Sequence, residues 1–491
     1  MIRISRCPVL PTAPSRVASG AMTNLADEEM IEMEVHGATI DLNDTSTAQL
    51  ISHSDDEDVE AKGETVIVDR AEHRGRWWFF YPAPHEPGYG PPHLSLFRLF
   101  VIFLGMGIRG FGGPVAQISL MKQQFVEEGR WMSVALFNRV YAFYQVIPGP
   151  EATEIAIYFG YQCRGFIGGL LSGLGFILPG FCLLLFFSWL YVTVGFENPV
   201  AQASFKAVQP AVTAMIFAAV RKLSEHSFAD REHRFSVWLA FLGLLGLIFT
   251  VLRINFLITL AYAGALNVAY SFRSRRWVVV LMALSGVVAI VTYALVVYFT
   301  GPLGRFTISP DIDATPTAGS LFLLAMVGGM LTFGGAYTTI PFIQEDIVNV
   351  GGWLTNDQFL DGLAITNLLP TPTVMFVTFV GFVALRWGGA ILMTIGMFLP
   401  AFTFSLVFHH VFNWLLNNRV LMPIFEGFAA TVIGMVLVTA CGFLRDSVED
   451  PVQACIFMLA IFALTTYKGP LVQPALIISA AFCGQALYTT S

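Results

Sequence analysis

Apolar residues in this chain gather into long runs that begin near residue 94 and continue almost to the C-terminus. Short polar or glycine-rich links separate the runs, which approach the ~20 residues that a helix needs to cross a bilayer. The aromatic residues follow helical spacing and do not alternate, so a β-barrel is not indicated. The pattern predicts an all-α polytopic membrane protein with about 13 transmembrane helices, at residues 96–112, 132–162, 166–192, 201–222, 235–252, 254–270, 277–300, 320–341, 356–382, 388–412, 424–445, 451–466 and 470–487.

The same motifs occur twice in the chain, about 222 residues apart. Such self-similarity indicates an internal duplication. Both copies place glycines and prolines inside apolar stretches, where a helix would otherwise run unbroken. The paired motifs are Phe111-Gly112-Gly113 with Phe333-Gly334-Gly335, Trp131 with Trp353, and Pro148-Gly149-Pro150 with Pro370-Thr371-Pro372.

Basic residues give the orientation of the spans, since cytoplasmic loops are enriched in Lys and Arg. Three clusters fall on one side if four and then two spans separate them, which places the N-terminus in the cytoplasm. Span 277–300 then carries the chain across, so the two repeats enter from opposite faces, as in many secondary transporters. The clusters are Arg70, Arg74 and Arg76; Arg221, Lys222, Arg231 and Arg234; and Arg273, Arg275 and Arg276.

The composition agrees with this class, because 55% of the residues are hydrophobic and only 12% are charged. The net charge of −7 comes from an acidic segment, roughly residues 24–72, which has too little apolar surface to fold by itself. We therefore predict a disordered tail (1–93), a first repeat (94–276), an inverting span (277–300), a loop (301–319) and a second repeat (320–491). The first 22 residues contain Arg3, Arg6 and Arg16 and no acidic residue. Organellar transit peptides have the same bias, although we expect this protein to lie in the plasma membrane.

The glycine motifs are candidate substrate sites. Glycine accepts positive φ and lets backbone N–H groups turn toward a ligand, and a helix that restarts there points its positive end inward, which suits an oxyanion. Close packing of helices in lipid is the alternative role of such glycines. The candidate substrate-binding residues in and around these motifs are Phe111, Gly112, Gly113, Gln117, Phe333, Gly334, Gly335 and Tyr337.

The two Pro-x-Pro motifs break the spans 132–162 and 356–382. Prolines remove backbone donors and free carbonyl groups, so Pro148, Gly149, Pro150, Pro370 and Pro372 are further substrate-binding candidates. We interpret each broken span as one crossing made of two half-helices, with a re-entrant hairpin as the alternative.

Two acids, Glu151 and Glu154, follow the first break, and the second break has none. Acids within a membrane are costly and are usually functional. Both are proton-coupling candidates, because apolar surroundings favour the neutral form of a carboxyl group. Alternatively, one of them pairs with Arg109 or caps the following helix.

Arg109 directly precedes the first glycine motif. A guanidinium there could form bidentate hydrogen bonds with a tetrahedral oxyanion, which makes Arg109 a substrate-binding candidate. The alternative is that the side chain extends to the membrane interface from the end of its span.

The motifs resemble those of the long-chain, two-domain chromate transporter family. The resemblance lies in Phe111 to Ile118, Ile147 to Ala152, Phe333 to Tyr337 and Pro370 to Gly381, and it covers about residues 94–487. Thr371 departs from it, since the family usually has glycine there. The resemblance implies transport of chromate, or of a related oxyanion such as sulfate, and leaves the direction open.

These observations together predict a secondary transporter of chromate or a similar tetrahedral oxyanion, which binds where the two repeats meet. An anion channel, or a carrier for another small anion, is the alternative. The sequence contains no nucleotide-binding loop, no cluster of His, Cys, Asp or Glu at the spacing of metal ligands, and no motif of a catalytic nucleophile. We therefore expect that the protein is not an enzyme and that it uses no cofactor. Its expected partners are the oxyanion and the lipid bilayer, without nucleic acid, and a homodimer is left open.

Overall fold

The computed structural model describes residues 33–35, 38–40, 50–51 and 89–488, except for gaps at 93, 146, 196–197, 229–234, 255, 272–279, 281–283, 285, 288–290, 292–314, 334, 408–419 and 468. The chain forms two compact units, Met1–Arg74 and Gly75–Ser491. Most of the predicted inverting span 277–300 and of the loop 301–319 lies outside the described residues.

The first unit contains a small antiparallel sheet of three short strands. They are β1 (Met33–Val35), β2 (Ala38–Ile40) and β3 (Leu50–Ile51), in the order β1-β2-β3. Met33 pairs with Ile40, and Thr39 pairs with Ile51. The rest of Met1–Arg74 lies outside the described residues, so disorder of the segment 1–93 stays a prediction.

The described part of the second unit is helical. Each predicted span except 277–300 coincides with at least one of its helices, and two segments that the sequence analysis treated as links, α2 and α10, are also helical. The helices are α1 (Leu96–Arg109), α2 (Gly113–Met121, continued by a π-helical stretch Lys122–Glu128), α3 (Val134–Tyr144), α4 (Glu151–Leu190), α5 (Pro199–Ser227), α6 (Val237–Val251), α7 (Phe256–Ser271), α9 (Ala318–Met330), α10 (Ile340–Gln344), α11 (Asn356–Leu368), α12 (Phe376–Val407), α14 (Leu421–Ser447), α15 (Pro451–Thr466) and α16 (Val472–Tyr488).

Four of the described helical segments are long and apolar enough to cross a membrane: Glu151–Thr193, Pro199–Glu225, Thr373–Val407 and Leu421–Ser447. Several shorter helices begin at polar residues, because short polar side chains accept hydrogen bonds from the first free N–H groups of a helix. Ser95 and Ser133 cap α1 and α3 in this way. Thr317, Thr355 and Asp450 form capping boxes at α9, α11 and α15.

Helices α4 and α12 are each a hairpin of two antiparallel segments. In α4 the backbone leaves helical geometry at Arg164 and Gly165, and in α12 it does so at Leu385 and Arg386. The Ser172 hydroxyl donates to the Ala156 carbonyl across the first hairpin at 2.8 Å. At the same place in the second, the Thr378 and Thr394 hydroxyls lie 2.7 Å apart.

Gly160 and Gly381, which lie 221 positions apart at equivalent places in the two halves, are where the two segments of each hairpin touch. A methyl group added at Gly160 would meet the Gly168 carbonyl, and one added at Gly381 would meet the Gly389 carbonyl. Only glycine allows the backbones to approach this closely. These repeated glycines therefore hold the tight hairpins together.

The Pro-x-Pro breaks also reverse the chain. A methyl group added at Gly362 of α11 would meet the Phe379 ring of α12, and the rings of Phe359 and Phe376 lie 5.5 Å apart. In the first half, the rings of Phe137 and Phe159 lie 6.2 Å apart across Pro148 to Pro150. Half-helices in line would hold these residues tens of ångströms apart at ~1.5 Å of rise per residue. The prediction of one crossing made of two half-helices is therefore wrong, and the hairpin alternative describes both breaks.

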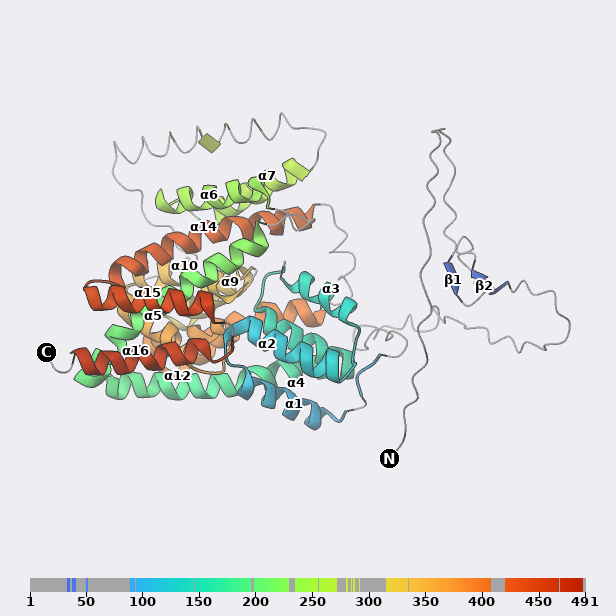
Figure 1. Cartoon of the computed structure of the whole chain (residues 1–491), viewed down its shortest axis with the longest axis horizontal. Coiled ribbons are helices and arrows are strands. Elements are labelled where there is room, and N and C mark those ends of the chain that lie inside the picture. Colours follow the sequence, from blue (N-terminus) through green and yellow to red (C-terminus); the bar gives the residue numbers. More distant parts are fainter. Residues whose placement is uncertain are drawn as a thin grey trace, which may run out of the picture. The chain divides into compact units, whose positions relative to one another are not determined.

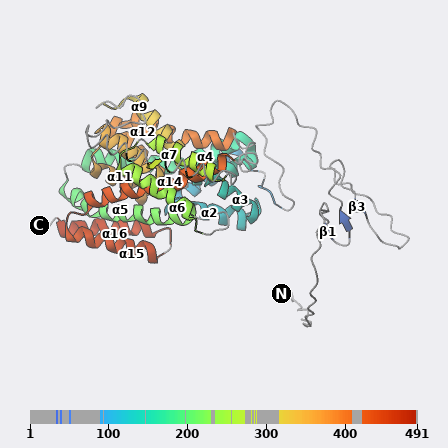
Figure 2. The same cartoon turned by 90° about the horizontal axis from the view of Figure 1, so that it is seen from above.

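The two halves exchange their last two helices. Helices α6 and α7 of the first half pack on α14 of the second, while α15 and α16 of the second pack on α5 of the first (Figure 1). Helices α5 and α14 contact each other, as do α4 and α12 (Figure 2). Each half thus buries its apolar surface against the other, and neither forms a separate core.

The turn of the second hairpin carries backbone strain that can be measured. Arg386 has φ 53° and ψ −143°, whereas its counterpart Gly165 has φ 62° and ψ −150°. Such geometry costs a non-glycine residue about 1–3 kcal/mol. We expect Arg386→Gly to stabilise the protein by about 1 kcal/mol, measured as a higher midpoint of thermal unfolding in detergent.

The control is Arg445→Gly, which changes an exposed arginine in the last turn of α14. This residue has ordinary helical geometry, so glycine there should destabilise the protein by up to about 1 kcal/mol. Equal shifts of the same sign in both variants would contradict the assignment of strain to Arg386.

Candidate functional site

The first glycine motif forms the beginning of α2. Gly112 and Gly113 have φ values of 90° and 75°, and Gly112, the N-cap residue, has no side chain that could cap the first turn. One turn later, Gln117 is 1% exposed, and its Nε2 donates to the Gly110 carbonyl at 2.8 Å. The Gln117 Oε1 is buried without a hydrogen-bond partner in the described part of the chain. Among the residues that the structure describes, helix α2 therefore has an unpaired buried oxygen near its start.

This helix start faces the second half of the chain. A methyl group added at Gly113 would lie 3.7 Å from both Thr373 Oγ1 and Gln473 Oε1. The Tyr337 hydroxyl donates to Asn367 Oδ1 at 3.2 Å and also interacts with the Thr373 and Gln473 side chains. We call Gly113, Tyr337, Asn367, Thr373 and Gln473 the first junction. It joins the glycine motif of one half to the proline break of the other.

A second junction joins the remaining two motifs. The Gly149 N–H donates to the Thr332 carbonyl at 2.8 Å, and Thr332 directly precedes the second glycine motif. Glu154 is 0% exposed and Glu151 is 5% exposed, so both acids are buried beside this contact. We call Gly149, Glu151, Glu154 and Thr332 the second junction. It contains carboxyl groups where the first junction contains hydroxyls and amides.

The other predicted site residues surround these junctions. Pro148 and Pro150 are buried beside Gly149, and Pro370 and Pro372 are buried on either side of Thr371. Phe333 is buried against the rings of Phe425 and Phe428, while Phe111 is half-buried. Gly335, with φ 143°, faces Leu223 of α5. Gly334 lies outside the described residues.

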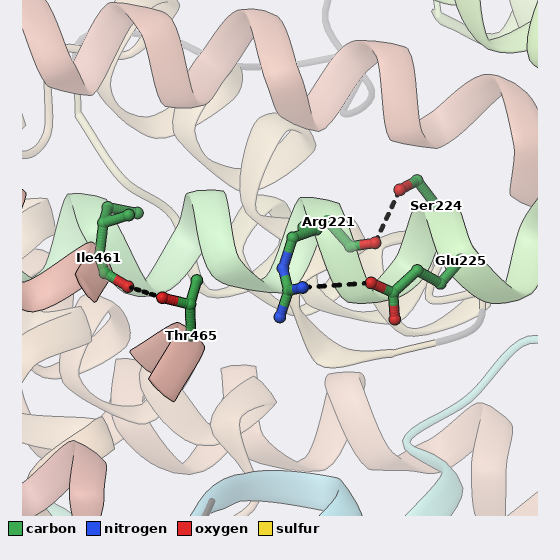
Figure 3. A network of polar contacts seen from close by, with 5 residues as sticks. All are labelled: Arg221, Ser224, Glu225, Ile461 and Thr465. Atoms are coloured by element: carbon green, nitrogen blue, oxygen red, sulfur yellow. Dashed lines mark hydrogen bonds and ion pairs between the residues drawn. The ribbon is translucent and has the colours of Figure 1, made fainter. Parts of the chain in front are cut away.

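The basic residues are arranged differently from the prediction. Arg109 is exposed, with Nε donating to the Gly105 carbonyl at 3.1 Å and Nη2 to Gln124 Oε1 at 3.2 Å. These contacts turn its guanidinium toward α1 and the π-helical stretch, so the substrate role of Arg109 stays a prediction. Lys222, the last residue of the predicted span 201–222, lies in α5 and interacts electrostatically with Glu151 and Glu225. Beside it, Arg221 pairs with Glu225 at 3.3 Å (Figure 3).

Comparison with known proteins identifies the family. The sequence model of the chromate transporter family matches residues 97–287 and 319–485. The chain belongs to the chromate transporter family. Its members are transporters and not enzymes, and the apolar helices make this transporter an integral membrane protein.

Relatives of this transporter occur in several bacteria. It is 37% identical over 402 residues to a chromate transport protein from Pseudomonas aeruginosa, covering 81% of this chain and 94% of the relative. It is 26% identical to a chromate transport protein from Cupriavidus metallidurans over 81% of this chain and 94% of the relative. An uncharacterised transporter, YwrA, from Bacillus subtilis is 27% identical over 33% of this chain and 92% of its own length. No solved structure matches the chain.

Four polar residues in and near the two junctions escaped the sequence analysis as site residues: Asn367, Thr373, Gln473 and Lys222. None belongs to a glycine or proline motif, and Gln473 lies 360 positions from Gly113 along the chain. Only the exchange of α15 and α16 between the halves brings Gln473 to α2. A polar residue within a predicted span was the available signal.

A buried carboxylate outside the junctions ties α11 to the first half. Asp361 is 6% exposed and accepts hydrogen bonds from the Tyr191 hydroxyl at 2.7 Å and from Gln209 Nε2 at 3.1 Å. These donors come from the end of the α4 segment and from α5. The network explains why an acid is tolerated there, since a buried charge needs hydrogen bonds.

We expect Asp361→Ala to destabilise the transporter by about 2 kcal/mol, because it removes the acceptor of two buried donors. The midpoint of thermal unfolding in detergent measures the effect. Asp357→Ala, one turn earlier and exposed, is the control and should stay within about 0.5 kcal/mol of the wild type. Equal losses in the two variants would count against a structural role for the Asp361 network.

Proposed function

We propose that this protein is a secondary transporter that carries chromate, or a similar tetrahedral oxyanion such as sulfate, between its two halves. Two relatives carry the name chromate transport protein, which supports this substrate class. The observation that carries the proposal is the first junction, where the uncapped start of α2 opens onto hydroxyl and amide groups of the other half. Anions bind at such helix starts because the N–H groups and the helix dipole both favour negative charge.

The donors of the first junction suit a tetrahedral dianion. The Thr373 hydroxyl, the Gln473 amide and the second N–H of the Asn367 amide, whose first donates to the Leu363 carbonyl at 2.9 Å, can approach an anion from several directions, as oxygens at tetrahedral angles require. The Tyr337 hydroxyl can join them when it releases Asn367 Oδ1. The described residues of this junction include no carboxylate that would repel the ligand. Hydrogen bonds to a charged acceptor are the stronger kind, so neutral donors are sufficient to hold it.

The arrangement of the halves supports alternating access. We propose that they are inverted repeats, that about 13 helices cross the membrane, and that the substrate binds where the repeats meet. Equivalent hairpins at Gly165 and Arg386 and the reciprocal packing of α5 and α14 support a duplicated scaffold. In transporters of this plan, rocking of one unit against the other exposes a central site to each side in turn.

We also propose that the protein lies in the plasma membrane with a cytoplasmic N-terminus, as the basic clusters indicate. For a dianion, an inside-negative potential of about 100 mV favours exit by about 4.6 kcal/mol, at about 2.3 kcal/mol per charge. Export then needs no other driving force, whereas uptake needs coupling to another ion.

Gly113→Ala tests the first junction. The added methyl group would occupy the space between the start of α2 and the side chains of Thr373 and Gln473, at 3.7 Å from each. It would keep the anion from at least one donor, a loss of about 1.4 kcal/mol that corresponds to a tenfold rise in KM. The measurement is chromate flux into proteoliposomes that contain the purified protein, with sulfate as competitor.

Gly352→Ala is the matched control. Gly352 also has a positive φ, of 61°, but a methyl group there would meet nothing within 4 Å, so the backbone strain is similar and the junction is untouched. Equal flux in Gly113→Ala and the wild type would contradict the site. Flux that rises linearly with chromate concentration, without saturation, would favour a channel over a carrier.

A further inference from the structure

We propose that the second junction is the site of the coupling ion, a proton carried on the Glu154 carboxyl group, and that Gly149 is glycine in order to make room for that group. This inference rests on the proposed function and assigns the two junctions different ligands. The anion binds at the first junction, and the proton binds at the second.

The Glu154 carboxyl group is enclosed and makes no hydrogen bond within the part of the chain that the structure describes. The side chain is 0% exposed, and neither Oε1 nor Oε2 has a hydrogen-bond partner within the described ranges. Glu151 Oε1, one turn earlier on the same helix, is likewise without a partner among those residues. An ionised carboxylate in such surroundings is costly, and binding a proton removes the cost.

Gly149 provides the space for this carboxyl group. A methyl group added at Gly149 would lie 2.7 Å from the carboxyl carbon of Glu154, closer than real contacts allow, and 3.1 Å from its Oε2. The Glu154 side chain thus folds back over the proline break, and a side chain at the middle residue of Pro148-Gly149-Pro150 would displace its carboxyl group. The space beside Gly149 is thus filled by the Glu154 carboxyl group and is not open to an anion.

The second half supports this interpretation, because it lacks both residues together. At the equivalent place, 222 positions later, Thr371 replaces Gly149, and the residues 221 and 222 positions after Glu154 are Met375 and Phe376. The Thr371 hydroxyl donates to the Thr366 carbonyl at 3.2 Å, and Phe376 is fully buried. Glycine and acid therefore occur as a pair in one half and are absent as a pair in the other.

The groups around Glu154 suggest a path for the proton. Glu151 and Tyr158 lie on its own helix, Tyr144 of α3 interacts with it electrostatically, and Lys222 of α5 interacts with Glu151. Lys222 is exposed, whereas Glu151 and Glu154 are buried. A proton can thus pass from water beside Lys222 through Glu151 to Glu154.

The step is a simple protonation. One proton from the aqueous side bonds to a carboxylate oxygen of Glu154, which becomes a neutral carboxylic acid, and the same proton leaves to water after the halves rearrange. No electrons move, and no other covalent bond forms or breaks. With one proton per dianion, the net charge moved falls from two negative charges to one, which makes uptake less opposed by the membrane potential.

The first test compares the wild type with Glu154→Gln in proteoliposomes under an imposed pH gradient, in sodium-free buffer. We expect the gradient to accelerate chromate flux in the wild type and to have at least tenfold less effect in Glu154→Gln. Exchange of labelled for unlabelled chromate without a gradient should fall by less than threefold. Glu127→Gln, which removes an exposed acid paired with Lys122 at 3.7 Å, should respond to the gradient like the wild type.

The second test does not depend on transport. Infrared difference spectra of the purified full-length protein between acid and alkaline buffer should contain a C=O band of a protonated carboxyl group that is missing in Glu154→Gln and retained in Glu127→Gln. An unchanged band in Glu154→Gln would overturn the proposal. A wild-type response of Glu154→Gln to the pH gradient, or a requirement for sodium, would also overturn it.

The two tests separate this proposal from the proposed function. If the wild type moves no chromate but the infrared band behaves as expected, the substrate is wrong and the proton site stands. If chromate flux is saturable and Gly113-dependent but the band is unchanged, the substrate stands and the proton site is wrong. Gly149→Ala gives an independent check, since it should shift or abolish the band by displacing the carboxyl group.

Discussion

The contact between the Gly149 N–H and the Thr332 carbonyl shows the constraint on which the rest of this structure depends. A helix that breaks inside an apolar protein frees backbone groups, which need partners because water and lipid cannot supply them there. This chain breaks its helices at Pro148 to Pro150 and at Pro370 to Pro372, and groups of the other half lie against each break. The halves are therefore bound to each other at the places where each is least regular.

The exchange of helices follows from the same constraint. If α6 and α7 packed on α5, and α15 and α16 on α14, each half would bury its apolar surface within itself. Packing α6 and α7 on α14, and α15 and α16 on α5, closes the two halves around the breaks. The same exchange brings Gln473 and Pro470 against the glycines at the start of α2.

The two halves share their backbone scaffold but differ in the side chains at the junctions. The hairpins at Gly165 and Arg386 have nearly the same backbone geometry, although one of the two residues is strained in it. At the junctions, by contrast, Thr373 stands 222 positions after Glu151, and Met375 and Phe376 stand 221 and 222 positions after Glu154. An anion and a carboxylate repel each other strongly at low dielectric, so the proposed separation of anion and proton between the junctions avoids placing both charges in one site.

The sequence by itself determined the helical class, the helix positions and the duplication, because these depend on local patterns of apolar residues, caps, glycines and prolines. It also indicated the motifs that meet at the junctions. The tertiary structure alone decided that each break is a hairpin, that Arg109 points away from the glycines, and that Asn367, Thr373 and Gln473 gather at Gly113. A break in a helix has the same sequence whether the chain continues or turns back, and only packing between distant segments selects one outcome. The partner of a freed polar group is chosen in the same way, by the three-dimensional approach of residues hundreds of positions apart.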